Sequence, residues 1–334
     1  MVDAKLQQAT KQIVAKTILA ADESTNTIKK RFDSIGVEST PEKNREYRQL
    51  LFTSKGLENF ISGVILFDET INQKLDNNQT IPSFLLSKRI SPGIKVDQGI
   101  EIIPSLNPDT YTRGLDSLNN KLMKYKKLGS VFAKWRAVFT ISNNSPSNLS
   151  IMRNAKDLAQ YASLCQKTGI VPIVEPEVLM DGVHSIKKDS EVTEKVLSAV
   201  FEQLLLYKID LKAIILKPNM ITAGSKNNEQ VSIYAVAQNT LDVLRKTVPK
   251  KVPGIAFLSG GQSPDLATEH LNLINKIANK NKTNYPWRLT ASYGRALQGE
   301  VLIVWKGKKG NEQAAQKVFI ERAEKVYKAS FGML

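Results

Sequence analysis

The sequence predicts an α/β fold of the (β/α)8 TIM-barrel type, with residues 1–334 forming a single domain. Short runs rich in Val and Ile recur along the chain, and such runs are typical of parallel strands buried on both faces. Amphipathic segments with apolar residues at i, i+3 and i+4 lie between these runs. The intervals leave room for a helix and its loops in every crossover, so the strands are expected to be parallel.

Eight runs are expected to be strands, each a short Val- and Ile-rich segment. They lie at 17–21, 63–67, 93–96, 131–135, 170–174, 213–216, 255–258 and 289–292. Helices are expected at 41–51, 115–127, 147–166, 189–207, 232–246 and 264–278, with an N-terminal helix at about 3–16, a C-terminal helix at about 311–329 and a short tail to 334. The Asn-Leu-Ser-Ile segment at 148–151 resembles a helix start, and Pro264 after Ser263 suits a first helical turn.

The competing architecture is a doubly wound sheet, because 334 residues are enough for two domains of ordinary size. That fold would place a Gly-rich GxGxxG turn after its first strand. Here the turn reads DESTNTI, which favours the barrel.

The composition is that of a globular protein. Hydrophobic residues make up 42% and charged residues 24%, which excludes collagen-like, low-complexity and wholly disordered chains. No apolar run approaches the ~18 residues of a membrane span. The N-terminus lacks an apolar signal region and the single Cys165 cannot form an internal disulfide, so a cytoplasmic location is expected. The net charge of +15 fits nucleic acid, a membrane surface or a phosphorylated metabolite as partner.

Ionisable side chains gather at the ends of the expected strands, where barrel enzymes carry their chemistry. They are Asp22, Glu23, Lys95, Asp97, Lys134, Arg136, Glu175, Glu177, Lys217 and Arg295. Lysines in strands covered on both faces are hard to explain as solvated edge residues, because unpaired buried charge is costly. The pattern predicts a functional site at this end of the barrel.

Lys217 directly follows four apolar residues and precedes a proline. Two interpretations stay open: a rim lysine paired with Glu175 or Glu177, or a Schiff-base nucleophile whose pKa is lowered by desolvation and by the nearby cations Lys134 and Arg136. The two glutamates are at i and i+2, so both point to the same side of an extended segment. One could serve as a protonated general acid beside an ionised neighbour, or both could form salt bridges with the lysines.

Glycines follow the last two strands, where barrels often bind a phosphate through backbone N–H groups and a helix N-terminus. The segments are Ser259-Gly260-Gly261 and Ser292-Tyr293-Gly294-Arg295, and Arg295 suits a bidentate phosphate contact. Thr27, Lys30 and Arg31 form a second basic cluster, for which a solvated helix face is the alternative.

No metal site or cofactor is predicted. His184, His270 and Cys165 are isolated from one another, and no metal-ligand spacing occurs. We expect each histidine on the surface or in a loop, and Cys165 as a packing residue on a helix.

In this order, the motifs closely resemble those of class I fructose-1,6-bisphosphate aldolase, the Schiff-base, metal-independent type. The matching segments are ILAADEST (18–25), GVILFDET (63–70), GIKVDQG (93–99), FAKWR (132–136), IVPIVEPEVL (170–179), LKPNM (216–220), FLSGGQS (257–263) and SYGRALQ (292–298). The resemblance covers about residues 5 to 330. It implies a glycolytic and gluconeogenic lyase that reversibly cleaves fructose 1,6-bisphosphate to dihydroxyacetone phosphate and glyceraldehyde 3-phosphate.

The resemblance also implies roles for the residues at the strand ends. Lys217 would form the imine with the ketose, Glu175 would be the acid and base of carbinolamine dehydration, and Asp22 would accept the proton of the C4 hydroxyl. Lys134 would lower the pKa of Lys217 and position the substrate, and Glu177 would hold the charge network in place. The substrate-binding residues would be Ser259, Gly260, Ser292, Gly294 and Arg295 for the dihydroxyacetone phosphate half, and Thr27, Lys30, Arg31, Lys95 and Arg136 for the other half.

Two departures from the family pattern are visible. Asn26-Thr27 replaces the usual Gly-Ser, which keeps the hydroxyl, and the chain stops at KVYKASFGML, about twenty residues before the family's usual tyrosine-ended tail. Tyr327 or another group could replace that tyrosine, or the chain could be truncated. We expect cleavage of the C3–C4 bond to persist while protonation of the enamine becomes slower.

The resemblance also implies a homotetramer. Another Schiff-base barrel, such as a transaldolase or a deoxyribose-phosphate aldolase, is the rival enzyme, but it lacks this full set of motifs. Binding of RNA or cytoskeletal polyanions is a possible secondary activity of the basic surface, although no aromatic-rich RNP-like motif accompanies the lysines.

Overall fold

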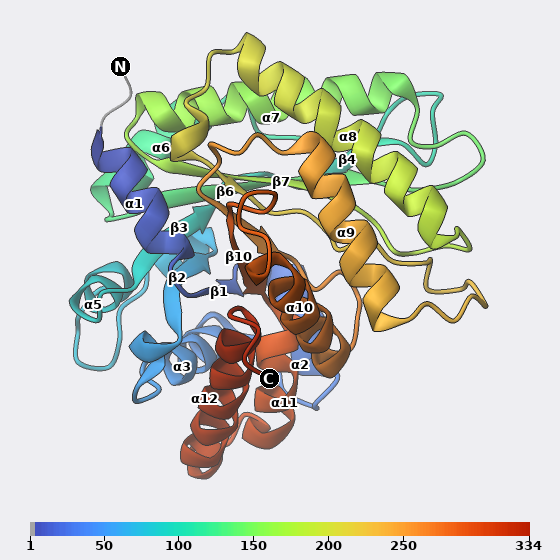
Figure 1. The fold of residues 1–334 in the computed structure, drawn as a ribbon. Helices are drawn as coiled ribbons and strands as arrows, with labels where there is room; N and C mark the ends of the chain where they lie inside the picture. The colour runs from blue at the N-terminus through green and yellow to red at the C-terminus, as the bar shows by residue number, and fades with distance from the viewer. Residues whose placement is uncertain (1–3) are drawn as a thin grey trace.

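A computed structural model describes residues 4–334, and its centre is a closed barrel of eight parallel strands (Figure 1). Around the barrel the strand order is β1-β10-β9-β8-β7-β6-β3-β2. The strands are β1 (Thr17–Ala21), β2 (Ile61–Leu66), β3 (Ser91–Lys95), β6 (Phe132–Phe139), β7 (Val171–Val178), β8 (Ile215–Leu216), β9 (Gly254–Phe257) and β10 (Arg288–Tyr293). Each lies on one of the eight expected runs, so the predicted TIM barrel is confirmed.

Helices surround the barrel on its outside (Figure 1). They are α1 (Ala4–Val14), α2 (Thr25–Asp33), α3 (Pro41–Phe52), α4 (Asp68–Ile71), α5 (Ile81–Ser87), α6 (Leu118–Lys127), α7 (Asn148–Lys167), α8 (Ile186–Leu206), α9 (Ile233–Thr247), α10 (Pro264–Asn279), α11 (Arg295–Trp305) and α12 (Glu312–Ala329). Residue 3, where the N-terminal helix was expected to begin, lies outside the described residues. Helices α2, α4, α5 and α11 were not among the expected ranges.

Serines begin several of these helices. The side chains of Ser147, Ser185, Ser232 and Ser263 each accept the backbone N–H of the residue three positions further on, at the starts of α7, α8, α9 and α10. Such a bond satisfies one of the four N–H groups that a helix start leaves without an internal partner. Pro264 occupies the first position of α10, where its missing N–H costs nothing.

The lower part of the barrel interior is apolar. Phe132, Val171, Ile173, Ile215 and Ala256 belong to one buried cluster inside the strands. Ile13 and Val14 of α1 join the same cluster, so this helix closes the N-terminal end of the barrel. The interior is therefore a packed core below the level at which the charged residues begin.

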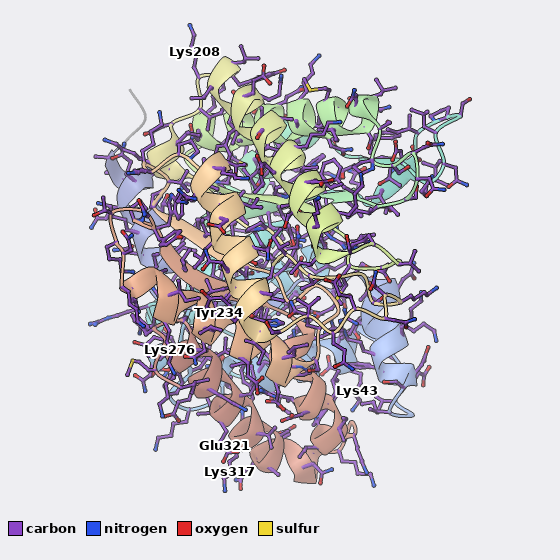
Figure 2. All side chains as sticks on the ribbon, turned by 45° about the vertical axis from the view of Figure 1, so that its right-hand side comes forward. Lys43, Lys208, Tyr234, Lys276, Lys317 and Glu321 are labelled. Atoms are coloured by element: carbon purple, nitrogen blue, oxygen red, sulfur yellow. The ribbon has the colours of Figure 1, made fainter. Side chains whose placement is uncertain are left out.

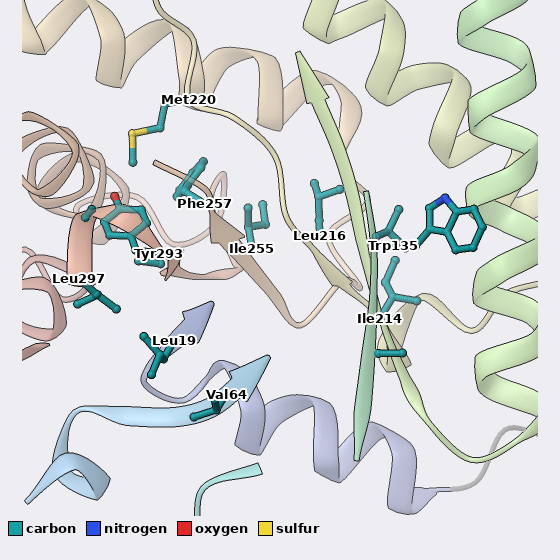
Figure 3. Packing of buried hydrophobic residues seen from close by; sticks show 14 of the residues in the cluster. Leu19, Val64, Trp135, Ile214, Leu216, Met220, Ile255, Phe257, Tyr293 and Leu297 are labelled. Carbon is teal, nitrogen blue, oxygen red and sulfur yellow. The ribbon is translucent and has the colours of Figure 1, made fainter. Parts of the chain in front are cut away.

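A larger apolar core lies between the strands and the helices. Figure 3 shows part of it, with Leu19, Val64, Ile255 and Tyr293 on the outward faces of the strands. Because side chains alternate along a strand, Leu19 packs outward while its neighbours Ile18 and Ala20 belong to the inner cluster. This alternation decides which residues can enter the barrel interior.

The structure adds an antiparallel hairpin that was not expected. It consists of β4 (Ile100–Ile102) and β5 (Thr110–Thr112). Its threonines attach it to the barrel, because the hydroxyls of Thr110 and Thr112 donate to the carbonyls of Val138 and Arg136 at 3.2 and 2.7 Å. The hairpin thereby supports the end of β6, which carries Arg136.

No helix among residues 4–334 is long and apolar enough to cross a membrane.

The glycine at position 93 makes room for the ring of Phe132 in the barrel interior. A Cβ atom there would lie 2.2 Å from Cε2 of Phe132. We therefore expect Gly93→Ala to lower the free energy of unfolding by about 1–3 kcal/mol, through overpacking. The measurement is urea unfolding followed by circular dichroism. The control is Gly299→Ala on α11, where a Cβ meets nothing within 4 Å and should stabilise the helix by about 0.5–1 kcal/mol. Equal effects of the two variants would contradict this account.

Candidate active site

Two adjoining cavities open at the carboxyl ends of the strands. The first, of about 680 Å³, extends to Lys121 and Lys124 of α6 and is called here the α6 cavity. The second, of about 500 Å³, includes Ser259 and Gly260 after β9 and is called the β9 cavity. Both cavities share a boundary formed by Ala20, Asp22, Arg31, Lys134, Arg136 and Gly294. The shared boundary lies at the end of the barrel where chemistry was expected.

A buried cluster of alternating charges lies at this boundary. The Lys134 ammonium is 2.8 Å from an Asp22 oxygen and 3.3 Å from Oε2 of Glu175. The other oxygen of Glu175 is 2.9 Å from Nζ of Lys217. The Lys134, Glu175 and Lys217 side chains are each about 5% exposed or less. Glu175 therefore joins two lysines, and of the two glutamates considered as partners of Lys217 it is Glu175 that contacts this lysine.

Strand alternation places these side chains together. Lys134, Glu175 and Lys217 each come two residues after an inward apolar residue, namely Phe132, Ile173 and Ile215. They therefore point into the barrel interior, one layer of side chains above these apolar residues.

Neighbouring charges control the ionisation of the cluster. Burial raises the pKa of Asp22, but the positive charges of Lys134 and Lys217 outweigh burial and hold that pKa well below its ordinary value. Burial lowers the pKa of Lys134, and the carboxylates of Asp22 and Glu175 outweigh it in turn, so that this pKa lies well above its ordinary value. At neutral pH Asp22 is a carboxylate and Lys134 is an ammonium.

Two further ion pairs frame the cluster. Nε of Arg136 donates to Glu177, and Lys95 donates to Oδ1 of Asp97. The two glutamates of β7 therefore have different cationic partners, although they point to the same side of the strand. Burial lowers the pKa of Arg136, but the Glu177 carboxylate outweighs it and raises that pKa, so this pair stays charged.

The glycine-rich ends of β9 and β10 lie beside each other in the β9 cavity. Gly260 and Gly261 have φ of 59° and 100°, a conformation that glycine adopts without strain. A Cβ atom on Gly261 would lie 3.8 Å from the Arg295 guanidinium at the start of α11. The Ser292 hydroxyl lines the same cavity, and it is buried without a hydrogen-bond partner among the described residues. This arrangement suits an anion beside a helix N-terminus.

The second basic cluster is only partly brought to the site. Thr27 and Arg31 line the α6 cavity, whereas Lys30 is exposed on α2 and lines neither cavity. Arg31 donates to Glu23, which also accepts from the buried Arg48. Glu23 therefore holds the Arg31 side chain in position.

The expectation for the histidines was wrong for His270, which is 3% exposed on α10, with Nδ1 2.6 Å from Oε1 of Gln262. Burial lowers its pKa to about 4. His184 lies in a loop as expected, but it is buried rather than on the surface. Cys165 is a buried residue of α7, as predicted. Among residues 4–334, no group of three or more His, Cys, Asp or Glu could hold a metal ion.

The fold and the site define a class of protein: a TIM-barrel enzyme with lysine and carboxylate groups gathered at the carboxyl ends of its strands. The model of the family described as fructose-bisphosphate aldolase class-I, glycolytic, matches residues 5–334. The chain belongs to the class-I fructose-bisphosphate aldolase family. It is a lyase that cleaves fructose 1,6-bisphosphate in glycolysis.

Individual relatives agree with this assignment. The chain is 48% identical over 317 residues to fructose-bisphosphate aldolase 4, cytosolic, of Arabidopsis thaliana, covering 95% of this chain and 80% of that protein. It is 49% identical over 323 residues to fructose-bisphosphate aldolase C of Carassius auratus, covering 96% and 88%. A solved structure of the Plasmodium falciparum aldolase, in complex with TRAP and a small-molecule inhibitor, has a TM-score of 0.96 at 46% identity, covering 99% of this chain and 96% of that chain.

A second layer of hydrogen bonds connects β7 to the segment after Lys217. Oδ1 of Asn219 accepts the N–H of Val178 at 3.0 Å, and its amide nitrogen lies 3.4 Å from the Thr193 hydroxyl. That hydroxyl donates to Asp189 at 2.8 Å, and the other Asp189 oxygen accepts the N–H of Thr222 at 2.8 Å. Sequence reasoning missed this connection, because it joins a helix, a strand and a loop that are distant in the chain.

Asp189 should make the stability of the protein depend on pH. Burial raises its pKa from 3.8 to about 7, with only partial compensation from its hydrogen bonds to Thr222 and Thr193. Between about pH 4 and 7 the folded state therefore holds a proton that the unfolded state has lost, so this contribution to stability is fully present below pH 4 and is lost progressively as pH rises through 7. At higher pH the ionised carboxyl costs about 4 kcal/mol.

We expect the stability of Asp189→Asn, measured relative to the unchanged protein, to increase as pH rises from 4 to 8. The measurement is the free energy of unfolding by urea at each pH. The control is the exposed Asp116→Asn, for which the difference should stay flat. A difference for Asp189→Asn that is independent of pH would contradict the assignment.

Proposed function

We propose that this aldolase cleaves its substrate through a covalent imine on Lys217. The observation that carries the proposal is the buried contact of 2.9 Å between the Lys217 ammonium and Glu175, with Lys134 on the other oxygen of that carboxylate. An amine attacks a carbonyl only in its neutral form, and Glu175 is placed to accept the proton that Lys217 must lose. Lys134 holds a fixed positive charge beside the same carboxylate.

Imine formation then needs one acid and one base, and Glu175 serves as both. The neutral Lys217 amine attacks the ketone carbon C2 and forms a carbinolamine. Glu175 returns its proton to the carbinolamine hydroxyl, which leaves as water, and a protonated imine remains. This iminium is the electron sink for the next step, so these reaction steps require no metal ion.

Asp22 is placed to start cleavage of the C3–C4 bond. Its low pKa keeps it ionised, and it accepts the proton of the C4 hydroxyl. The C4 oxygen becomes the aldehyde of glyceraldehyde 3-phosphate, and the electrons of the broken bond move into the iminium to give an enamine. Protonation at C3 and hydrolysis of the imine release dihydroxyacetone phosphate and restore Lys217.

The remaining predicted residues bind and position substrate in this proposal. The dihydroxyacetone phosphate half enters the β9 cavity, where its phosphate meets Ser259, Gly260, Ser292, Gly294 and Arg295. Thr27, Arg31, Lys95 and Arg136 face the other half in the α6 cavity. Glu177 holds Arg136 in place, and Lys30, exposed on α2 outside both cavities, contributes only its positive charge.

We also propose that residues 1–334 act as one domain in a cytoplasmic homotetramer. Exposed apolar side chains at separate places on two helices support association: Leu205 and Leu206 at the end of α8 are 53% and 65% exposed, and Tyr234 at the start of α9 is 61% exposed. The net charge of +15 supports secondary binding of polyanions such as RNA or cytoskeletal filaments. Figure 2 shows lysines such as Lys208 projecting from the outer surface.

Borohydride reduction in the presence of dihydroxyacetone phosphate tests the imine. We expect a single covalent adduct, located at Lys217 by mass mapping, and no adduct in Lys217→Met. The control is Lys212→Met, an exposed lysine five positions earlier, which should be labelled at Lys217 like the unchanged protein. An adduct on another lysine, or none in the unchanged protein, would overturn the proposal.

Asp22→Asn should separate the two halves of the reaction. Since the amide cannot accept the C4 proton, kcat for fructose 1,6-bisphosphate should fall by about 10²-fold or more, while the adduct with dihydroxyacetone phosphate still forms. The control is the exposed Asp33→Asn on α2, with kcat close to that of the unchanged protein. Equal loss of cleavage and of adduct formation would show that Asp22 does not act at the proposed step.

A further inference from the structure

The cations of the α6 cavity fall into two groups. Four of them have carboxylate partners: Lys134 with Asp22 and Glu175, Arg136 with Glu177, Lys95 with Asp97, and Arg31 with Glu23. The other two, Lys121 and Lys124, form no ion pair with any residue in the described part of the chain. The positive charge in this cavity that no carboxylate of the described residues offsets therefore lies on α6.

Both lysines are presented to the cavity by the packing of their helix. They are three positions apart, so they lie on the same side of α6. Leu118, Leu122 and Tyr125 bury the adjacent face, and the Tyr125 hydroxyl donates to Asp68 of α4 at 2.7 Å. This hydrogen bond fixes α6 at the cavity wall and occupies one oxygen of the nearby carboxylate.

The length of the substrate extends it toward these lysines. Fructose 1,6-bisphosphate carries one phosphate at each end of a six-carbon chain, and the reacting carbons must lie at Lys217 and Asp22. Because one phosphate is assigned to the β9 cavity, the carbons beyond C4 must point into the α6 cavity. The second phosphate therefore enters the α6 cavity, in which Arg31, Lys95, Lys134 and Arg136 already have carboxylate partners.

We propose that Lys121 and Lys124 bind the phosphate on the aldehyde half and set the preference for a ketose bisphosphate over a ketose 1-phosphate. This inference rests on the proposed function, because it takes the position of the reacting carbons from the imine at Lys217. The two ammonium groups act together with Thr27 and Lys95, which line the same cavity. Neither lysine takes part in bond making or bond breaking.

The expected effect follows from the exposure of the two side chains. Lys124 is exposed and Lys121 is half-buried, so each contact with a phosphate dianion resembles an exposed ion pair. Two such contacts change kcat/KM by about tenfold. Salt screens exposed charges, so the contribution should shrink at high ionic strength.

The test compares two substrates that differ only in the second phosphate. For Lys121→Met/Lys124→Met, kcat/KM should fall about tenfold with fructose 1,6-bisphosphate, mainly through KM, and by less than twofold with fructose 1-phosphate. The double variant Lys121→Arg/Lys124→Arg keeps both positive charges, so it should retain most of the kcat/KM of the unchanged protein with fructose 1,6-bisphosphate. The control is Lys127→Met, an exposed lysine of α6 that lines neither cavity.

The outcomes distinguish this inference from the proposed function. An equal fall for both substrates, or no fall for either, would overturn the role of the lysine pair. Borohydride labelling at Lys217 should be unchanged in the double variant. Failure of that labelling in the unchanged protein would instead overturn the imine mechanism, and the comparison of substrates would still show whether the lysine pair recognises the second phosphate.

Discussion

The rest of the site depends on the buried cluster formed by Asp22, Lys134, Glu175 and Lys217. Removing these charges from water is costly, and the cost is tolerated only because cation and anion alternate within 2.8 to 3.3 Å. Glu175 is the residue that joins the two lysines, so a change in its position would alter both contacts.

The barrel supplies the rigidity that such a cluster requires. Strand alternation places Lys134, Glu175 and Lys217 directly above an apolar layer, which α1 closes from the other end. Around this interior a second apolar core presses the helices onto the strands. Behind the strands, Asn219 connects the N–H of Val178 to the segment after Lys217. Charged side chains are therefore held by strands, and the loops beyond them complete the cavities.

Sequence reasoning located the barrel strands and most of the charged residues that line the two cavities for a physical reason: both follow from local pattern. A buried strand needs an apolar run, and a charge at its end is visible in the sequence. The pairing of Lys217 with Glu175 rather than Glu177 was not visible, because it depends on how β6, β7 and β8 meet. The β4–β5 hairpin was missed because its strands are three residues long, and Lys121 was missed because α6 reaches the cavity only through tertiary packing.

The cations of the two cavities differ in whether a carboxylate pairs with them. This difference explains how one site can keep charged groups at its reaction centre and still attract an anionic substrate. Lys134 and Arg136 are paired with carboxylates, so their positive charge is largely offset at the reaction centre. Arg295 at the end of the β9 cavity forms no ion pair with any residue from 4 to 334, and the same holds for the two lysines of α6. Uncompensated charge therefore lies at the two ends of the site, with the neutralised cluster between them. This distribution matches a substrate that carries its negative charge at its two ends and reacts in the middle.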